Sequence, residues 1–199
     1  MFVPAHNERL LNSASRSDAD VLILDIEDSV QPVSNKIIAR NNIVKYIGDH
    51  IFLNRPIYPR INDRESGELL KDIYALTIPG VSGFMYPKSI KGEDIYFIGK
   101  LLETVEYEKG FPIGTFKIIP LIETAGAIVN LKDICTACSR VVAVAFGCED
   151  YVTDLRGEHD EKGETRNFIN ERHHVLDASC TNSIADKTVL ILFTSKYMI

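Results

Sequence analysis

The sequence lacks several features that would place the protein in a specialised class. It contains no apolar run of membrane-span length, and its first residues do not form the charged, apolar and small regions of a secretory signal. No Pro/Gly/Ser-rich linker, internal repeat or low-complexity tract divides its 199 residues. We therefore expect one soluble, cytoplasmic domain that spans residues 1–199.

Positive charge is also scarce. The chain has 22 Lys and Arg residues against 28 Asp and Glu residues, which gives a formal net charge of -6 at pH 7. Because no basic stripe stands out along the chain, neither nucleic acid nor an anionic membrane surface is an expected partner. An anionic substrate would need positive charge gathered at one place.

Cysteine is too rare to form a disulfide framework in a chain of this length, since there are only four. Cys135 and Cys138 have the Cys-x-x-Cys spacing, but no second pair of Cys or His residues lies near them, which argues against a zinc site. We expect these two thiols to be buried or half-buried.

The chain does contain a regular alternation of short apolar runs and helix-period segments. Because the apolar runs are nearly continuous, both faces of the strands should be covered by helices, as in a parallel sheet. A TIM barrel and a doubly wound sheet both satisfy this pattern. The expected strands are 2–4, 21–24, 57–61, 83–86, 117–122 and 141–146, and the expected helices are 8–15, 34–46, 67–76, 93–108, 125–138 and 164–180.

Polar clusters follow nearly every expected strand, and they favour the barrel. A doubly wound sheet concentrates its site at one switch point, whereas a TIM barrel gathers side chains from all of its strand ends. No Gly-x-Gly-x-x-Gly follows the first strand, so the main sequence reason to propose a dinucleotide fold is missing. We predict a TIM (β/α)8 barrel. The clusters are His6-Asn7, Asp25 to Asp28, Arg60 to Asp63, Pro87-Lys88, Glu123-Thr124 and Glu149-Asp150.

Two of these clusters place carboxylates after consecutive strands, Glu123 after 117–122 and Glu149-Asp150 after 141–146. Mg²⁺ prefers oxygen ligands and is usually held by one or two carboxylates plus substrate oxygens. A polar turn would also explain an acid at the end of either strand taken alone. Since adjacent residues of a strand point in opposite directions, only one of Glu149 and Asp150 should face a metal.

Six motifs, one for each expected strand, carry a family resemblance. They are Phe2-Val-Pro-Ala-His-Asn, Leu22-Ile-Leu-Asp-Ile-Glu-Asp28, Arg60-Ile-Asn-Asp63, Pro79-Gly-Val-Ser-Gly-Phe-Met-Tyr-Pro-Lys88, Ile119-Pro-Leu-Ile-Glu-Thr-Ala-Gly126 and Ala145-Phe-Gly-Cys-Glu-Asp-Tyr151. In this order they resemble the citrate lyase β-subunit branch of the HpcH/HpaI aldolase family. Asp28 stands where the pyruvate-type aldolases have a histidine, which favours the thioester lyases. A pyruvate-type class II aldolase that uses another base is the alternative.

The resemblance implies a Mg²⁺-dependent carbon-carbon lyase that acts on a hydroxy-acyl thioester, such as citryl-, malyl- or citramalyl-CoA or an acyl-carrier form. It implies that Glu123 and Asp150 are the metal ligands and belong to the catalytic site, where Glu123 also meets the substrate. Arg60 would bind a substrate carboxylate, a role compatible with pairing to Asp25 or Glu27. Arg9 would meet the thioester carrier, and the chain would form a homo-oligomer, a trimer or hexamer.

The resemblance fades after about residue 184, whereas a full barrel takes about 250 residues and eight strands. We find no equivalent of the Asp that serves as acid-base near the end of the family's sequence, although Asp186 is similar in character. The run 188–194 is expected to form a replacement strand or to have no selected structure. The chain therefore reads as a barrel truncated after six or seven strands. The alternative function is a catalytically incomplete fragment that binds Mg²⁺ and a keto acid without turnover.

Overall fold

The computed structural model describes residues 1–52, 55–156 and 192–193. Its residues group into two compact units, one formed by Met1–Met85 with Leu102–Lys117 and the other by Tyr86–Leu101 with Ile118–Ile199. The helix α4 contributes residues to both units, since it runs from Gly92 to Lys109. The expectation of one domain stays a prediction.

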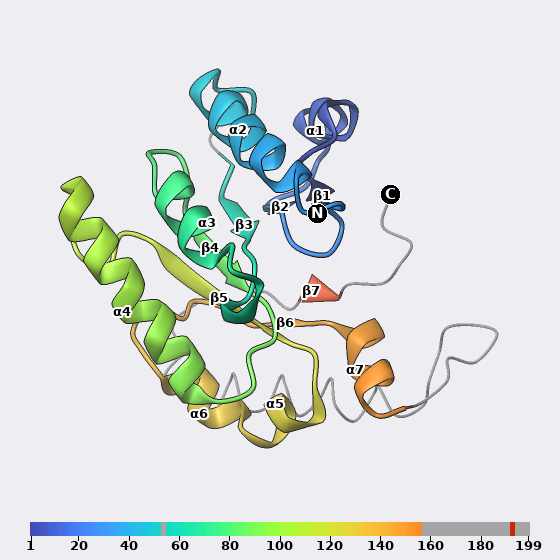
Figure 1. The fold of residues 1–199 in the computed structure, drawn as a ribbon, viewed down its shortest axis with the longest axis vertical. Coiled ribbons are helices and arrows are strands. Elements are labelled where there is room, and N and C mark those ends of the chain that lie inside the picture. Colours follow the sequence, from blue (N-terminus) through green and yellow to red (C-terminus); the bar gives the residue numbers. More distant parts are fainter. Residues whose placement is uncertain (53–54, 157–191, 194–199) are drawn as a thin grey trace. The chain divides into compact units, whose positions relative to one another are not determined.

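The first unit alternates strands and helices along the chain (Figure 1). Its strands are parallel and lie in chain order, with Leu22 opposite Ile57 and Arg60 opposite Met85. A short 3-10 helix, η1, precedes α3 and was not expected from the sequence. The elements are β1 (Phe2–Pro4), α1 (Glu8–Ser15), β2 (Leu22–Asp25), α2 (Asn35–Gly48), β3 (Ile57–Arg60), η1 (Arg64–Ser66), α3 (Leu69–Leu76) and β4 (Gly83–Tyr86).

The second unit continues the same alternation. Its strands are also parallel, with Ile122 opposite Phe146 and Phe146 opposite Phe193. Neither β1-β2-β3-β4 nor β5-β6-β7 contains the reversal of strand order that marks a doubly wound sheet, which supports the barrel class. The elements are β5 (Lys117–Ile122), α5 (Ala125–Val129), α6 (Leu131–Thr136), β6 (Ala145–Phe146), α7 (Cys148–Asp154) and β7 (Leu192–Phe193).

Burial follows the apolar strand runs. Leu22, Ile23 and Leu24 of β2 are fully buried, although their side chains point alternately to the two faces of the sheet. Helices must therefore cover one face and further side chains fill the other, as expected for an interior parallel strand. The carboxyl ends of the strands then project polar residues out of the apolar layer.

Two expected elements differ clearly from the observed ones, and one observed α-helix was not expected. The expected helix 125–138 is divided into α5 and α6 at Asn130, whose Nδ2 donates to the carbonyl oxygens of Ile90 and Gly126, each at 3.0 Å. Such a side chain competes with the backbone for helical hydrogen bonds. Of the expected strand 141–146, only Ala145 and Phe146 form β6, while an isolated bridge joins Val141 to Ile118. The unexpected helix α7 follows immediately.

Other expectations lie wholly or partly outside the described residues. Nothing described corresponds to the expected helix 164–180 or to Asp186, and only Leu192 and Phe193 of the expected strand 188–194 are described, as β7. Within the described part, no helix has the length and apolar character needed to cross a membrane.

Gly83 lies where the backbone of two strands packs closely in the first unit. A Cβ atom on Gly83 would lie 2.2 Å from the carbonyl oxygen of Lys117, whose N–H donates to the carbonyl of Ser82 at 3.1 Å. Because backbone atoms cannot move aside as a flexible side chain can, we expect Gly83→Ala to lower the free energy of unfolding by about 3 kcal/mol. Urea unfolding measures this. Gly48→Ala is the control, since a Cβ there meets nothing within 4 Å, and equal effects of both changes would contradict the packing.

Candidate functional site

Arg60, the last residue of β3, is held by acids that end or follow β2. Its Nε and Nη2 donate to the two carboxylate oxygens of Asp25 at 2.7 and 2.6 Å, and its Nη1 lies 3.2 Å from Oε2 of Glu27. Asp25 is the residue opposite Arg60 in the parallel sheet, so strand register alone brings the pair together. The pairing that the sequence allowed is therefore present. The binding of a substrate carboxylate by Arg60 stays a prediction.

The Asp25–Arg60 pair is buried, with side chains 3% and 12% exposed. Burial acts most strongly on Asp25 and would raise the pKa of its carboxyl group, but the hydrogen bonds and charge of Arg60 outweigh it and hold that pKa below its ordinary value. Burial would lower the pKa of Arg60, whereas Asp25, Glu27 and Asp28 raise it. Both groups are therefore charged at neutral pH.

The lowered pKa of Asp25 predicts a stability that acid removes. Its contribution is complete above the unfolded-state pKa of about 3.9 and is lost as the pH falls through the lower folded-state value. Between about pH 5 and pH 2, we expect the stability advantage of the wild type over Asp25→Asn to shrink as the pH falls. Urea unfolding at several pH values measures this.

Asp72 supplies a control of opposite sign. Burial raises its pKa, although hydrogen bonds from Asn62 and Arg40 oppose the rise. Ionisation of Asp72 therefore works against folding. As the pH falls through the raised pKa, the free energy of unfolding of the wild type should increase relative to that of Asp72→Asn. The same pH trend for both variants would contradict the assignment.

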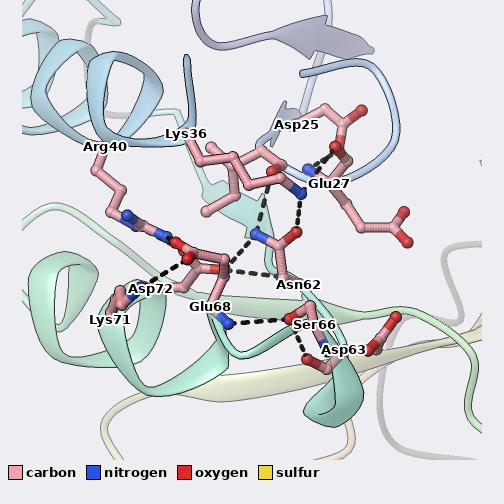
Figure 2. A network of polar contacts seen from close by, with 11 residues as sticks. Asp25, Glu27, Lys36, Arg40, Asn62, Asp63, Ser66, Glu68, Lys71 and Asp72 are labelled. Carbon is pink, nitrogen blue, oxygen red and sulfur yellow. Dashed lines mark hydrogen bonds and ion pairs between the residues drawn. The ribbon is translucent and has the colours of Figure 1, made fainter. Parts of the chain in front are cut away.

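Asn62 is the centre of a buried polar network that the sequence did not predict (Figure 2). Its Nδ2 donates to the carbonyl of Ile26 at 3.1 Å and to Oδ2 of Asp72 at 2.7 Å, while its Oδ1 accepts from Nζ of Lys36. Nζ of Lys36 also lies 3.4 Å from the carbonyl oxygen of Glu27. These contacts hold the backbone of the segment that carries the Glu27 carboxylate.

Arg40 extends the same network to α3. Its guanidinium group pairs with Glu68 and with Asp72, the latter at 2.7 Å. Lys36 and Arg40 are four residues apart and so share a helix face with the buried residue Ile43. The sequence did not single out this face, because apolar residues of the same helix, Ile37, Ile38 and Val44, are exposed.

In the second unit, Glu123 follows β5 directly and is only 4% exposed. Its Oε1 accepts a hydrogen bond from the backbone N–H of Lys88 at 2.5 Å. The next residue, Thr124, caps α5 by accepting from the N–H of Ala127 at 3.1 Å. Glu123 and Thr124 alone therefore separate the strand β5 from the helix α5.

Asp150 and Glu149 lie in the first turn of α7, and the expectation that they sit on a strand end is wrong. The strand ends at Phe146, and Gly147 alone separates it from the helix. Successive residues of a helix are rotated by about 100° rather than 180°, so the two acids do not point in opposite directions. Asp150 is exposed and Glu149 half-buried.

The neighbourhood of Glu123 fits a hard metal ion in its chemistry. Ile122 and Phe146 are register partners, so Glu123 and Gly147 follow on adjacent strands. Oε2 of Glu123 lies 3.2 Å from the position that a Cβ on Gly147 would occupy, so a carboxylate oxygen fills the space a side chain would take. Among the described residues, no group of three or more His, Cys, Asp and Glu side chains could hold a metal ion. Two carboxylates completed by water and substrate oxygens remain compatible with Mg²⁺.

The other residues singled out in the sequence have simpler surroundings. Arg9 is exposed on α1, so its contact with a thioester carrier stays a prediction. Cys135 is buried and Cys138 half-buried, both as free thiols, which confirms the expected burial. Burial raises the pKa of the Cys135 thiol to about 11, so this thiol is protonated and unreactive at neutral pH.

Comparison with known proteins gives a consistent result. The chain is 28% identical over 185 residues to the citrate lyase subunit beta of Leuconostoc mesenteroides subsp. cremoris, covering 93% of this chain and 60% of that protein. It is 28% identical over 158 residues to the L-malyl-CoA/beta-methylmalyl-CoA lyase of Rhodobacter capsulatus, covering 78% of this chain and 49% of that protein. The chain thus spans about half to three-fifths of these relatives.

A solved structure of the citrate lyase beta subunit of M. tuberculosis, complexed with oxaloacetate and magnesium, has a similar fold. The TM-score is 0.72 at 25% identity, and the match covers 97% of this chain and 76% of that chain. This likeness confirms the fold class expected from the sequence. The model of the HpcH/HpaI aldolase/citrate lyase family matches residues 1–193. The chain therefore belongs to the HpcH/HpaI aldolase/citrate lyase family.

Proposed function

We propose that the protein is a Mg²⁺-dependent carbon-carbon lyase acting on a hydroxy-acyl thioester, such as citryl-, malyl- or citramalyl-CoA or an acyl-carrier form. The observation that carries this proposal is the buried carboxylate of Glu123, set at the end of β5 beside the turn into α7 that bears Asp150. Family relatives named as a citrate lyase subunit beta and an L-malyl-CoA/beta-methylmalyl-CoA lyase support the reaction class.

Glu123 and Asp150 would hold the metal. Both supply oxygen donors, and both follow the carboxyl ends of neighbouring parallel strands. When bound, Mg²⁺ polarises a substrate oxygen and so stabilises the negative charge that develops as the carbon-carbon bond breaks. The hydrogen bond from the N–H of Lys88 restricts the Glu123 carboxylate before a metal arrives, which reduces the ordering required on binding.

Arg60 would bind a carboxylate of the substrate. Asp25 occupies the edge formed by Nε and Nη2 of the guanidinium group, so a substrate would approach the adjoining edge, formed by Nη1 and Nη2. A planar guanidinium can donate two parallel hydrogen bonds from each of these edges. Asp25 thereby holds the rotamer of Arg60. A substrate carboxylate would have to compete with Glu27 for Nη1.

The thioester carrier and the assembly are further parts of the proposal. Arg9, exposed in the first turn of α1, would interact with the phosphates of a CoA or acyl-carrier arm. A homo-oligomer, trimeric or hexameric, would follow the family resemblance. Light scattering coupled to size exclusion measures the mass, and a monomer at all concentrations would exclude that state.

Metal removal gives the test of the proposed reaction. With Mg²⁺, the protein should release acetyl-CoA or its acyl-carrier equivalent from one of the named thioesters. EDTA should abolish this release and added Mg²⁺ restore it, because the Lewis acid supplies several kcal/mol of the transition-state stabilisation. Release that persists in EDTA would overturn the proposal. Calorimetric binding of Mg²⁺ and oxaloacetate without cleavage of any thioester would favour the catalytically incomplete alternative.

A further inference from the structure

We propose that Gly147 and the backbone of Lys88 are positioning residues, which together fix the Glu123 carboxylate in the orientation needed to ligate a divalent metal. The inference rests on the proposed function, because it assigns Glu123 as a ligand. Both residues belong to the same unit as Glu123. They contact its side chain from the loop after β4 and from the turn after β6.

Gly147 is a glycine for reasons of space and not of backbone conformation. Its φ of -93° is one that any residue adopts. A Cβ there, however, would lie 3.0 Å from Cβ and 3.2 Å from Oε2 of Glu123. Contacts of 3.0 Å between carbon atoms are well inside the optimal separation of about 3.5–4.0 Å. The space left by the missing methyl group is therefore the space that the Glu123 side chain uses.

The backbone at Gly147 has little freedom to relieve such a contact. Its N–H donates to the carbonyl of Ile122 at 2.8 Å, and its carbonyl accepts from the N–H of Tyr151 at 3.1 Å. The first bond belongs to the sheet edge beside β5, and the second is the opening hydrogen bond of α7. An added methyl group would therefore displace the Glu123 carboxylate more readily than it would displace the turn.

Lys88 holds the other side of the same carboxylate through its backbone. It has a φ of +52°, the left-handed conformation that residues other than glycine rarely adopt. Its N–H donates to Oε1 of Glu123 at 2.5 Å. A strained backbone of this kind persists only where surrounding contacts require it, and such positions cluster at functional sites. The hydrogen bond to Glu123 identifies the contact that this strained residue serves.

The two residues lie next to different oxygens of the Glu123 carboxylate. The Lys88 N–H meets Oε1, and the open face of Gly147 accommodates Oε2. Residues that orient a metal ligand from behind typically change metal affinity by about 10–100-fold when altered. A residue that only maintained the fold would change stability and leave the affinity of the folded protein unchanged.

The test compares metal affinity with stability in matched variants. Calorimetric titration with Mg²⁺ alone and electron paramagnetic resonance of Mn²⁺ give the affinity, and urea unfolding gives the stability. We expect Gly147→Ala to weaken metal binding by about 10–100-fold. Gly126→Ala is the control in the same unit, since its Cβ would meet Ile90 at 3.3 Å without touching Glu123, and its metal affinity should equal that of the wild type.

Two variants of Lys88 provide a second test, which does not depend on whether Gly147→Ala folds. Lys88→Gly retains the N–H and favours a positive φ, so its metal affinity should match the wild type. Lys88→Val retains the N–H but disfavours that φ, and its affinity should fall. A loss of metal affinity in Lys88→Gly would show that the ammonium group of Lys88, and not its backbone, is required. This result would overturn the assignment of the backbone as the positioning group.

The possible failures are distinguishable. If the wild type binds no divalent metal, the proposed metal site fails. If the wild type binds metal and both Gly147→Ala and Lys88→Val bind it equally well, the site stands and the positioning inference is wrong.

Discussion

Replacing Glu123 with glutamine should remove both metal binding and turnover while leaving the fold intact. Glutamine has the same shape and keeps an oxygen that can accept from the N–H of Lys88, but it lacks the negative charge that attracts a divalent cation. Because Lewis-acid stabilisation is worth several kcal/mol and each 1.36 kcal/mol is tenfold in rate, thioester cleavage should fall by at least about 10³-fold. Steady-state release of acetyl-CoA measures the change.

The matched control for this change is Glu106→Gln. Glu106 is also a buried glutamate that accepts backbone N–H groups, those of Gly114 and Phe116, each at 2.9 Å. The two substitutions therefore remove the same charge from similar backbone partners. We expect Glu106→Gln to lower stability without lowering the metal affinity of the folded protein. A loss of metal binding shared by both variants would show that folding, and not ligation, had been disturbed.

The second large effect is expected for Arg60→Lys. Lysine keeps the positive charge but cannot donate in parallel to Asp25 and to a substrate carboxylate. We expect the affinity for oxaloacetate in the presence of Mg²⁺ to fall by about 100-fold, since this loss of roughly two charge-assisted hydrogen bonds is worth about 3 kcal/mol. The affinity for Mg²⁺ alone should stay unchanged, because Arg60 is not a ligand. Calorimetry measures both constants.

Arg40→Lys separates the substrate role of Arg60 from a purely structural one. Arg40 is likewise a buried arginine of the first unit that pairs with two acids, Glu68 and Asp72. Breaking a buried ion pair can destabilise a protein by about 3–5 kcal/mol, so both arginine variants should lose stability. Only Arg60→Lys should lose oxaloacetate affinity. Equal losses of affinity in the two variants would reduce Arg60 to a structural residue.

Much of the fold was accessible from the sequence because parallel strands produce continuous apolar runs. β1, β4, β5 and α1 were predicted with their observed bounds. The division at Asn130 and the helix α7 were missed. The division depends on the Asn130 side chain, which competes for backbone hydrogen bonds, and α7 has only seven residues, so hydrophobic periodicity indicates neither feature.

The candidate site was only partly accessible. Charged residues at strand ends can be recognised from the sequence, so Glu123 and Arg60 were singled out, and the family resemblance suggested a role for each. The contacts behind them could not be, because they join residues far apart in the chain, such as Lys36 with Asn62 and Lys88 with Glu123. Gly147 was also overlooked, since a glycine required for space and not for conformation has no local signature.

The most direct test of the metal assignment is to locate the ion itself. Crystals grown with Mn²⁺ in place of Mg²⁺ would give an anomalous signal at the metal position. We expect a single strong peak within coordination distance of the carboxylates of Glu123 and Asp150, with water or oxaloacetate oxygens as the remaining ligands. A peak bound instead by Glu27 or Asp28, or no peak near Glu123, would contradict the metal assignment.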